Sequence, residues 1–276
     1  MGLLDFFTPH NNSPTNENKS DSRYFLDAQK LWDYRIGGYS NPSKAIELLN
    51  KAISLNPKDD GHYSHRGLAY AQLQKYDLSI QDYTKAIDLN PGSIFYLISR
   101  GRAYADIKKY QNALDDFNKV IKLDPQEPTG YINRLIIYWD LGKYKEALDD
   151  DNRLIEIDPN NCEYYLGRGW HYAELKKYEN AIEDYRKAIL INPEHGYGRA
   201  WQELAITYGK LNRYNDAIDV LHEALRINPE HYGLWHNLVI AYILSGNRTD
   251  AIKTIEELQR INPEMADKLL NEIMQQ

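Results

Sequence analysis

Seven of the eleven prolines recur at a nearly constant interval, in steps of 34, 34, 34, 34, 36 and 34 residues. The text between them is repeated as well. It reads RGLAYAQLQKYDLSIQDYTKAIDLNP before one proline and RGRAYADIKKYQNALDDFNKVIKLDP before the next. A constant period of about 20–50 residues is the signature of one structural unit stacked on copies of itself. We therefore expect one elongated array over residues 21–263, whose repeats end at Pro57, Pro91, Pro125, Pro159, Pro193, Pro229 and Pro263.

Each repeat is predicted to contain two helices. Tyr63, Gly67 and Tyr70 have the spacing of one helix face, and a second apolar run with the same period follows a turn near Lys75. Asn90 ends this second helix, because the residue before a proline is pushed out of the α-helical region. No stretch alternates like a β-strand, so the sequence predicts an all-α chain.

The N-terminal part departs from this plan. Residues 1–20 are mostly polar and predict a disordered tail. The first seven residues, MGLLDFF, are apolar except for Asp5, and they are either a frayed terminus or a docking peptide for a membrane surface, a partner or the protein's own groove. An amphipathic run from Tyr24 to Ile36 then predicts a first helix that ends at Gly37 and Gly38.

Composition argues against several classes of protein. A net charge of −7, from 33 basic and 40 acidic side chains, argues against nucleic acid as a partner, because phosphate binding needs a basic surface. No apolar run approaches about 18 residues, so no membrane span is expected, and the N-terminus lacks the features of a signal peptide. The single cysteine, Cys162, cannot form an internal disulfide, which favours a reducing, cytoplasmic compartment.

Equivalent positions of the repeats carry the same residue types. The first helices share an aromatic residue, a small residue and then a tyrosine, and the second helices share an alanine. These residues are Tyr63, Tyr131, Tyr165, Trp201 and Trp235; Gly67, Gly101, Gly169 and Ala205; Tyr70, Tyr104, Tyr138, Tyr172, Tyr208 and Tyr242; and Ala113, Ala147, Ala181, Ala217 and Ala251. As a set they resemble the tetratricopeptide repeat (TPR) family over about residues 22–263.

The resemblance implies a fold. It is a right-handed α-solenoid of about seven antiparallel helix–turn–helix repeats, in which first helices line a concave groove and second helices form the convex back. Apolar residues at helical spacing in residues 264–276 predict a capping helix over the last repeat.

Two correlations between repeats predict contacts inside each helix pair. Arg66, Arg100, Arg134 and Arg168 share one position of the first helix, and Asp82, Asp116, Asp150 and Asp184 share the matching position of the second. Where the arginine is replaced, at Leu204 and Leu238, the acid is absent too. We therefore predict four Arg–Asp pairs.

Side-chain volume is also exchanged between the two helices. Glycine at 67, 101 and 169 accompanies an aromatic residue at 83, 117 and 185, whereas Leu135 accompanies Asp151. Close packing conserves volume at a contact, so each glycine is expected to receive a ring. On this reading Asp151 is tolerated because Leu135 fills the space.

The sequence does not point to catalysis. It lacks a P-loop, a Rossmann glycine fingerprint, a nucleophile elbow and the histidine spacing of a zinc protease helix. Cys162 begins a helix without an evident basic partner, so we interpret it as structural. We expect no enzyme activity, no metal and no cofactor.

The remaining candidate site is the groove. Some first-helix positions are not needed inside a repeat and, by the resemblance, face the concave side. These are Phe95, Ile98, Arg102, Asp106, Ile132, Ile136, Trp139, Asp140, Leu166, Trp170, Glu174, Arg199, Gln202, Ile206, Lys210, His236 and Ile240. An aromatic, apolar groove with few charges suits an extended or helical peptide. The alternative is that these residues pack against neighbouring first helices.

The predicted function is that of a non-catalytic scaffold which binds a protein or peptide segment in this groove. One alternative is a structural assembly subunit or homo-oligomer that uses its convex or terminal faces. Another is a regulatory subunit of an enzyme system.

Overall fold

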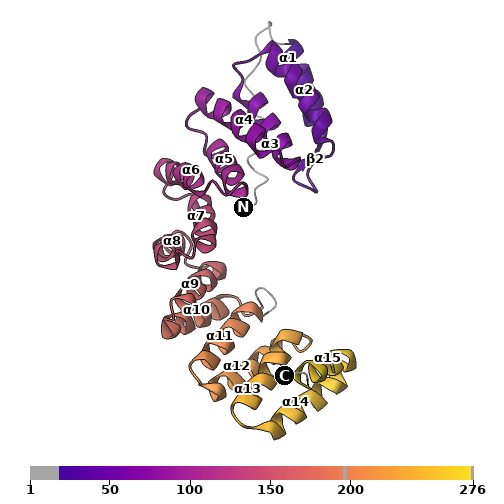
Figure 1. Ribbon diagram of the computed structural model, residues 1–276, viewed down its shortest axis with the longest axis vertical. Coiled ribbons are helices and arrows are strands. Elements are labelled where there is room, and N and C mark those ends of the chain that lie inside the picture. The colour runs from indigo at the N-terminus through magenta and orange to yellow at the C-terminus, as the bar shows by residue number, and fades with distance from the viewer. Residues whose placement is uncertain (1–18, 195–197, 275–276) are drawn as a thin grey trace. The chain divides into compact units, whose positions relative to one another are not determined.

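The computed structural model describes residues 19–194 and 198–274, and Figure 1 labels its helices. The chain divides into two compact units, residues 1–137 and residues 138–276. The first contains α1 (Lys19–Gln29), β1 (Trp32–Asp33), β2 (Gly38–Tyr39), α2 (Pro42–Leu55), α3 (Asp60–Gln72), α4 (Tyr76–Leu89), α5 (Ile94–Asp106), α6 (Tyr110–Leu123) and most of α7 (Pro128–Asp140). The second contains the end of α7, α8 (Tyr144–Ile157), α9 (Cys162–Glu174), α10 (Tyr178–Ile191), α11 (Arg199–Lys210), α12 (Tyr214–Ile227), α13 (Tyr232–Leu244), α14 (Arg248–Ile261) and α15 (Pro263–Met274).

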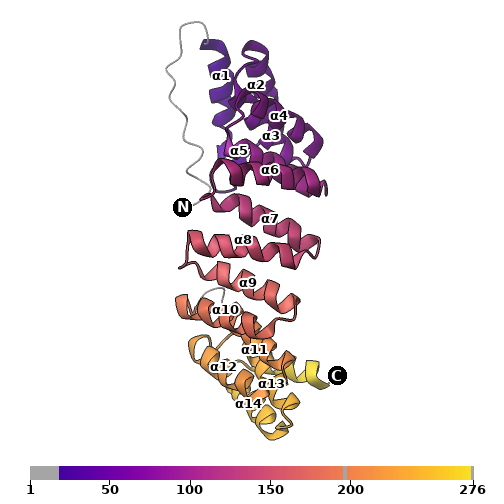
Figure 2. The ribbon, with the colours of Figure 1, turned by 90° about the vertical axis from the view of Figure 1, so that its left-hand side faces the viewer.

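The prediction of an all-α repeat array is confirmed, because helices α2 to α14 follow one another in the order that the proline period requires. In the second unit, α8, α9 and α10 lie as successive layers (Figure 2). Across the described residues, each helix is too short or too polar to traverse a bilayer. The tail, including MGLLDFF, falls in residues 1–18, which lie outside the described residues.

The first helix is shorter than predicted. It ends at Gln29, and Trp32 and Tyr39 pair across a small antiparallel hairpin, so the expectation that no strand forms is also wrong here. The reason is local: Gly37 adopts φ +60°, a left-handed conformation that reverses the chain before β2. Ile36, predicted to belong to the apolar helix face, is 61% exposed at this turn.

In the repeats after the first one, the turn between the two helices has one geometry. Residues such as Gln74, Lys108 and Lys176 have φ near +58°, and the next amide donates to the carbonyl of the tyrosine that precedes the turn, as from Lys75 to Tyr70 at 2.9 Å. This is the left-handed helix C-cap, which satisfies carbonyls that would otherwise lack partners at a helix end. The shared tyrosine therefore stands at a fixed place next to the turn.

The predicted exchange of volume is confirmed at the three glycines. A Cβ added to Gly101 would lie 2.5 Å from the ring of Phe117, and one added to Gly169 would lie 2.6 Å from that of Tyr185. At Gly67 the ring of Tyr83 would be 3.3 Å away. These rings are buried, so each helix pair is closed by a ring against bare backbone.

Three of the predicted ion pairs are confirmed, each with two parallel hydrogen bonds. Arg66 donates to Asp82 at 2.8 and 2.6 Å. Arg100 donates to Asp116, and Arg168 to Asp184, at 2.8 and 2.7 Å. The aspartates are buried and the arginines mostly so. The fourth pair, Arg134 with Asp150, involves residues of different units and stays a prediction.

The predicted capping helix corresponds to α15. Its Ala266 and Leu269 are fully buried, in the same apolar core as Leu258 of α14, whereas Leu270 is 44% exposed. The helix thus covers the last repeat of the second unit with one face and leaves the other exposed.

Candidate functional site

Two tryptophans of the second unit stack on each other. Trp139 near the end of α7 and Trp170 of α9 have ring centroids 5.4 Å apart and planes inclined by 27°. The guanidinium of Arg199, from α11, lies 5.0 Å from the Trp170 ring centroid, which is cation–π geometry. Three successive first helices therefore contribute one layer each to a stack of two rings and a cation.

The stack is accessible to a ligand. The Trp139 side chain is 41% exposed, and Trp170 is only partly buried. Both were predicted as groove residues. They pack on each other, as the alternative interpretation requires, yet Trp139 still presents much of its surface to solvent.

A buried polar pair lies beside this stack. Nδ1 of His171 and Oδ2 of Asp151 are 2.6 Å apart, and both residues are at most 5% exposed. The ring of His171 is 6.0 Å from that of Trp139 and 6.2 Å from that of Tyr144. Burial raises the pKa of Asp151, and the hydrogen bond with His171 opposes this shift. The tryptophans thus border a pair of ionisable groups.

Sequence reasoning missed His171 and Tyr144 and gave Asp151 a different role. A comparison of equivalent positions in the repeats could have identified His171 and its contact with Asp151. The position of His171 is otherwise held by Ala69, Ala103, Ile137, Thr207 and Ala241. The position of Asp151 is otherwise aromatic or aliphatic, so two polar residues depart from the pattern and meet each other.

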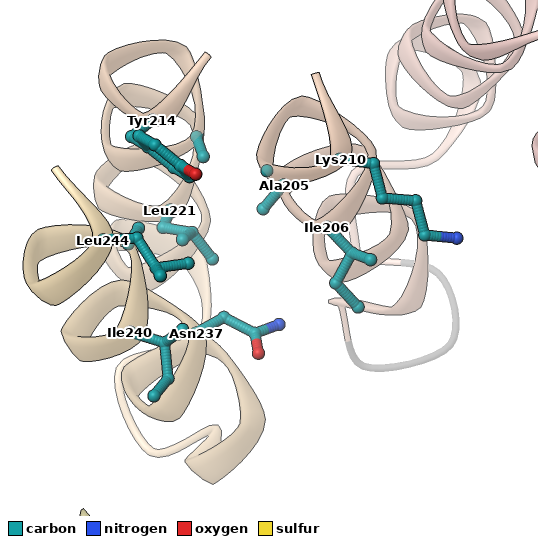
Figure 3. A pocket seen from close by; sticks show the side chains of 11 residues that line it. Ala205, Ile206, Lys210, Tyr214, Leu221, Asn237, Ile240 and Leu244 are labelled. Carbon is teal, nitrogen blue, oxygen red and sulfur yellow. The ribbon is translucent and has the colours of Figure 1, made fainter. Parts of the chain in front are cut away.

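Further along the second unit, predicted groove residues line a pocket. Ile206 and Lys210 of α11 and Ile240 of α13 belong to it, and its volume is about 310 Å³ (Figure 3). The other lining residues are Ala205, Gly209, Tyr214, Ala217, Leu221, Asn237, Ala241 and Leu244. The walls are almost wholly apolar, so this part of the face suits a hydrophobic side chain.

In the first unit the predicted residues form a separate face. Ile132 and Ile136 are 37% and 56% exposed, and Phe95 and Ile98 are half-buried. Arg102 donates from Nε to Oδ1 of Asn133 at 2.8 Å. Partial burial raises the pKa of Asp106, and the nearby charge of Arg102 opposes the shift. This face carries apolar side chains around one cation.

Leu166 corrects the prediction. It was expected in the groove, but its side chain is 2% exposed and belongs to the core of the second unit. Asp140, Glu174, Arg199 and Lys210 are exposed, as groove residues should be. The correction follows from helix geometry, because Leu166 is next to Tyr165 on the edge of the helix that faces the core.

Two further expectations concern reactive chemistry. Within the part of the chain that the structure describes, no group of three or more His, Cys, Asp or Glu side chains is placed to hold a metal ion. Cys162 is buried, and burial raises the pKa of its thiol, which disfavours the reactive thiolate.

The repeats match those of known proteins. Sequence models of the tetratricopeptide repeat family match residues 62–93, 94–127, 128–161, 162–195 and 209–273. The chain therefore belongs to the tetratricopeptide repeat family. No curated protein sequence matches the chain significantly.

Several solved structures share the fold. YrrB, described as a TPR protein with an unusual peptide-binding site, is 21% identical with a TM-score of 0.55, over 69% of this chain and 97% of YrrB. A TPR protein from Parabacteroides merdae is 17% identical with a TM-score of 0.61, over 91% of this chain and 98% of that one. MamA from Desulfovibrio magneticus is 18% identical with a TM-score of 0.57, over 65% and 99%. These likenesses concern the fold.

Proposed function

We propose that this protein is a non-catalytic scaffold that binds a peptide or protein segment on its first-helix face. The stack of Trp139, Trp170 and Arg199 would be the main contact in the second unit. The observation that carries the proposal is an exposed tryptophan stacked on a second tryptophan, whose ring in turn contacts a cation. Tryptophan and arginine are the residues that most often dominate binding energy at protein interfaces.

The chemistry of the stack favours a particular type of segment. A flat aromatic surface takes up proline rings or large apolar side chains, and a rigid surface loses little entropy on binding. Arg199, Asp140 and Glu174 are exposed charges on the same first helices and would orient the polar parts of the segment. The peptide-binding site named for YrrB is a property of that protein, and it adds plausibility to a peptide ligand here.

A direct test uses the full chain and a displayed library of random peptides. Peptides selected by the wild type are measured against Trp139→Ala/Trp170→Ala by fluorescence anisotropy. Losing an interface centre of at least about 2 kcal/mol weakens binding roughly 30-fold. Leu190→Ala is the matched control, because Leu190 is 76% exposed and lies on the second helix α10.

Circular dichroism establishes that the double variant keeps its helices. Equal affinity of the folded double variant and the wild type would refute the proposed site. Loss of binding in Leu190→Ala alone would instead favour the assembly alternative, since Leu190 and Leu123 are exposed apolar residues of second helices. A cytoplasmic location is part of the proposal and rests on the lone, buried Cys162.

A further inference from the structure

The pocket of the second unit is open because its wall lacks large side chains. It lies between α11 on one side and α12 and α13 on the other (Figure 3). Ala205, Gly209, Ala217 and Ala241 face it, and Ile206, Ile240 and Leu244 form its sides. Its volume of about 310 Å³ lies at the lower end of small-ligand pockets, which are about 300–1,000 Å³.

Gly209 is the residue that most clearly leaves space. In the repeat ending at Pro159 the equivalent position is Trp139, in the repeat ending at Pro263 it is Ile243, and in three others it is an alanine. A Cβ added to Gly209 would meet nothing within 4 Å. A side chain there would therefore enter the pocket without displacing the protein's own atoms.

One polar group in the wall needs an acceptor. The side-chain nitrogen Nδ2 of Asn237 is buried and has no hydrogen-bond partner in the structure. Figure 3 shows this amide reaching from α13 towards Ile206 across the pocket. Buried donors are normally paired, so an occupant that brings a carbonyl or carboxylate oxygen would complete the site. Lys210 also lines the pocket, but its exposed ammonium group points away from the cavity (Figure 3), and it lies 5.8 Å from the ring centroid of Tyr178.

The chain itself contains a segment with the required chemistry. MGLLDFF places two apolar pairs, Leu3-Leu4 and Phe6-Phe7, on either side of one carboxylate, Asp5. In an extended segment alternate side chains point to opposite sides, so Leu4 and Phe6 share one side while Asp5 is on the other. Such a segment offers apolar side chains to the pocket and backbone carbonyls to Asn237. Asp5, on its other side, would face the ammonium group of Lys210 outside the pocket.

We propose that this pocket binds the Met1–Phe7 segment of a second copy of the chain. The segment and the pocket belong to different compact units, and a contact between copies requires no fixed arrangement of those units. Eighteen residues precede the described structure, and at about 3.3–3.6 Å each they reach up to about 60 Å. That length lets the segment leave its own copy and enter another.

The contact is heterologous, because a tail of one copy meets a pocket of the next. Such contacts build rings or open chains, so association is expected to increase with concentration. The proposal is independent of the tryptophan stack, which uses other residues. Trp139→Ala/Trp170→Ala is therefore expected to associate like the wild type.

Sedimentation velocity of the full chain over a concentration series tests the proposal. The wild type is expected to self-associate. Gly209→Leu, which fills the pocket, and Leu4→Ser/Phe6→Ser, which removes the apolar side chains of the segment, are each expected to weaken association at least about tenfold. Gly209→Ala is the matched control, because it adds one methyl group and leaves most of the pocket empty.

A mixing experiment gives the sharpest result. Gly209→Leu retains an intact segment, and Leu4→Ser/Phe6→Ser retains an intact pocket. Their equimolar mixture is expected to form a one-to-one dimer that neither variant forms alone. Absence of that dimer, or a wild type that stays monomeric at all concentrations, would overturn the proposal.

A charge exchange covers the case in which Gly209→Leu fails to fold. Lys210 is exposed, so Lys210→Glu is expected to fold normally and to weaken association about tenfold. Adding Asp5→Lys to the same chain should restore association. If the double exchange does not restore it, Asp5 does not lie against Lys210 and the proposed docking is wrong.

Discussion

Asp116 and Asp151 are buried to the same depth, at 2% and 1% exposure, but their partners differ. Asp116 of α6 receives two hydrogen bonds from Arg100, whereas Asp151 of α8 has one contact with His171. Arginine keeps its charge at any pH at which the protein is folded, and histidine does not. The regular repeat therefore has a bidentate ion pair with a permanent cation, and the repeat of Asp151 has a single contact between a carboxyl group and an imidazole.

The position of each pair adds to this contrast. Arg100 and Asp116 join the two helices of one repeat, so their contact stabilises the repeat itself. Asp151 and His171 join α8 to the next first helix, α9, beside the exposed Trp139. The comparison teaches that the ion pair of the regular repeat holds its own two helices together, whereas the pair of Asp151 and His171 connects neighbouring repeats next to the candidate binding surface.

The largest expected effect is on the permanent pair. Arg100→Ala leaves Asp116 buried without compensation, which should lower the free energy of unfolding by about 3–5 kcal/mol in urea titrations. Arg35→Ala is the control in the same unit, because Arg35 also makes paired hydrogen bonds with an aspartate but is fully exposed. It should cause no measurable loss. Similar losses in both variants would mean that burial does not decide the strength of these pairs.

A histidine with a neutral partner sharpens the comparison. His65 contacts the hydroxyl of Tyr39 at 2.6 Å, and burial lowers its pKa to about 4. The unfolded chain protonates His65 near pH 6.5 while the folded chain does not, so stability should fall as the pH is lowered from about 6.5 to about 4. The loss should be about 3 kcal/mol, since one pKa unit corresponds to about 1.4 kcal/mol.

His65→Gln isolates this effect from the carboxylates that titrate in the same range. The difference in stability between wild type and variant should shrink by that amount as the pH falls. A constant difference would show that His65 is protonated equally in both states.

The third prediction concerns the pair of Asp151 and His171. His171→Ala removes the partner of a buried carboxyl group and should cost about 1–3 kcal/mol. Asp151→Leu/His171→Ala restores residue types found at the equivalent positions, Leu221 and Ala241, and should return stability to within about 1 kcal/mol of wild type. A double variant as unstable as the single one would mean that the pair supports the fold in a way the regular repeats do not.

The smallest effects should appear at two glycines. Gly101→Ala would place its Cβ 2.5 Å from the Phe117 ring and should destabilise the first unit by about 1–3 kcal/mol. Gly167→Ala, in α9, would place its Cβ 3.8 Å from Oδ1 of Asp151, an ordinary contact. It should raise stability by about 0.5–1 kcal/mol, because alanine favours a helix interior. Thermal unfolding of both variants measures whether each substitution lowers or raises the stability of the protein.

The fold could be predicted from the sequence to a large extent. The period located the helix pairs, and volume exchange predicted that Gly101 receives the ring of Phe117. Arginine and aspartate are present together in some repeats and absent together in others, and this correlation predicted the hydrogen bond from Arg100 to Asp116. The hairpin at Trp32 and Tyr39 could not be predicted, because that segment has no equivalent in other repeats for comparison.

The candidate site was predictable only in part. Trp139 and Trp170 were recognised because they depart from the family pattern, but their stacking depends on the spacing between successive first helices. Leu166 was misplaced because a difference of one helix position decides between core and surface. The pairing of Asp151 with His171 was not predicted. Asp151 was explained within its own repeat by the volume of Leu135, and His171 was not singled out.

The sequence by itself determined what is local and repeated: helix pairs, their turns, and the contacts inside a pair. These depend on short-range geometry that the chain states once in every period. The tertiary structure alone decided what happens between neighbouring repeats. It showed that Arg199 covers Trp170, that His171 meets Asp151, and that a pocket beside Gly209 stays open. Such contacts depend on how whole helices pack, and a change of a single side chain can fill or open the space between them.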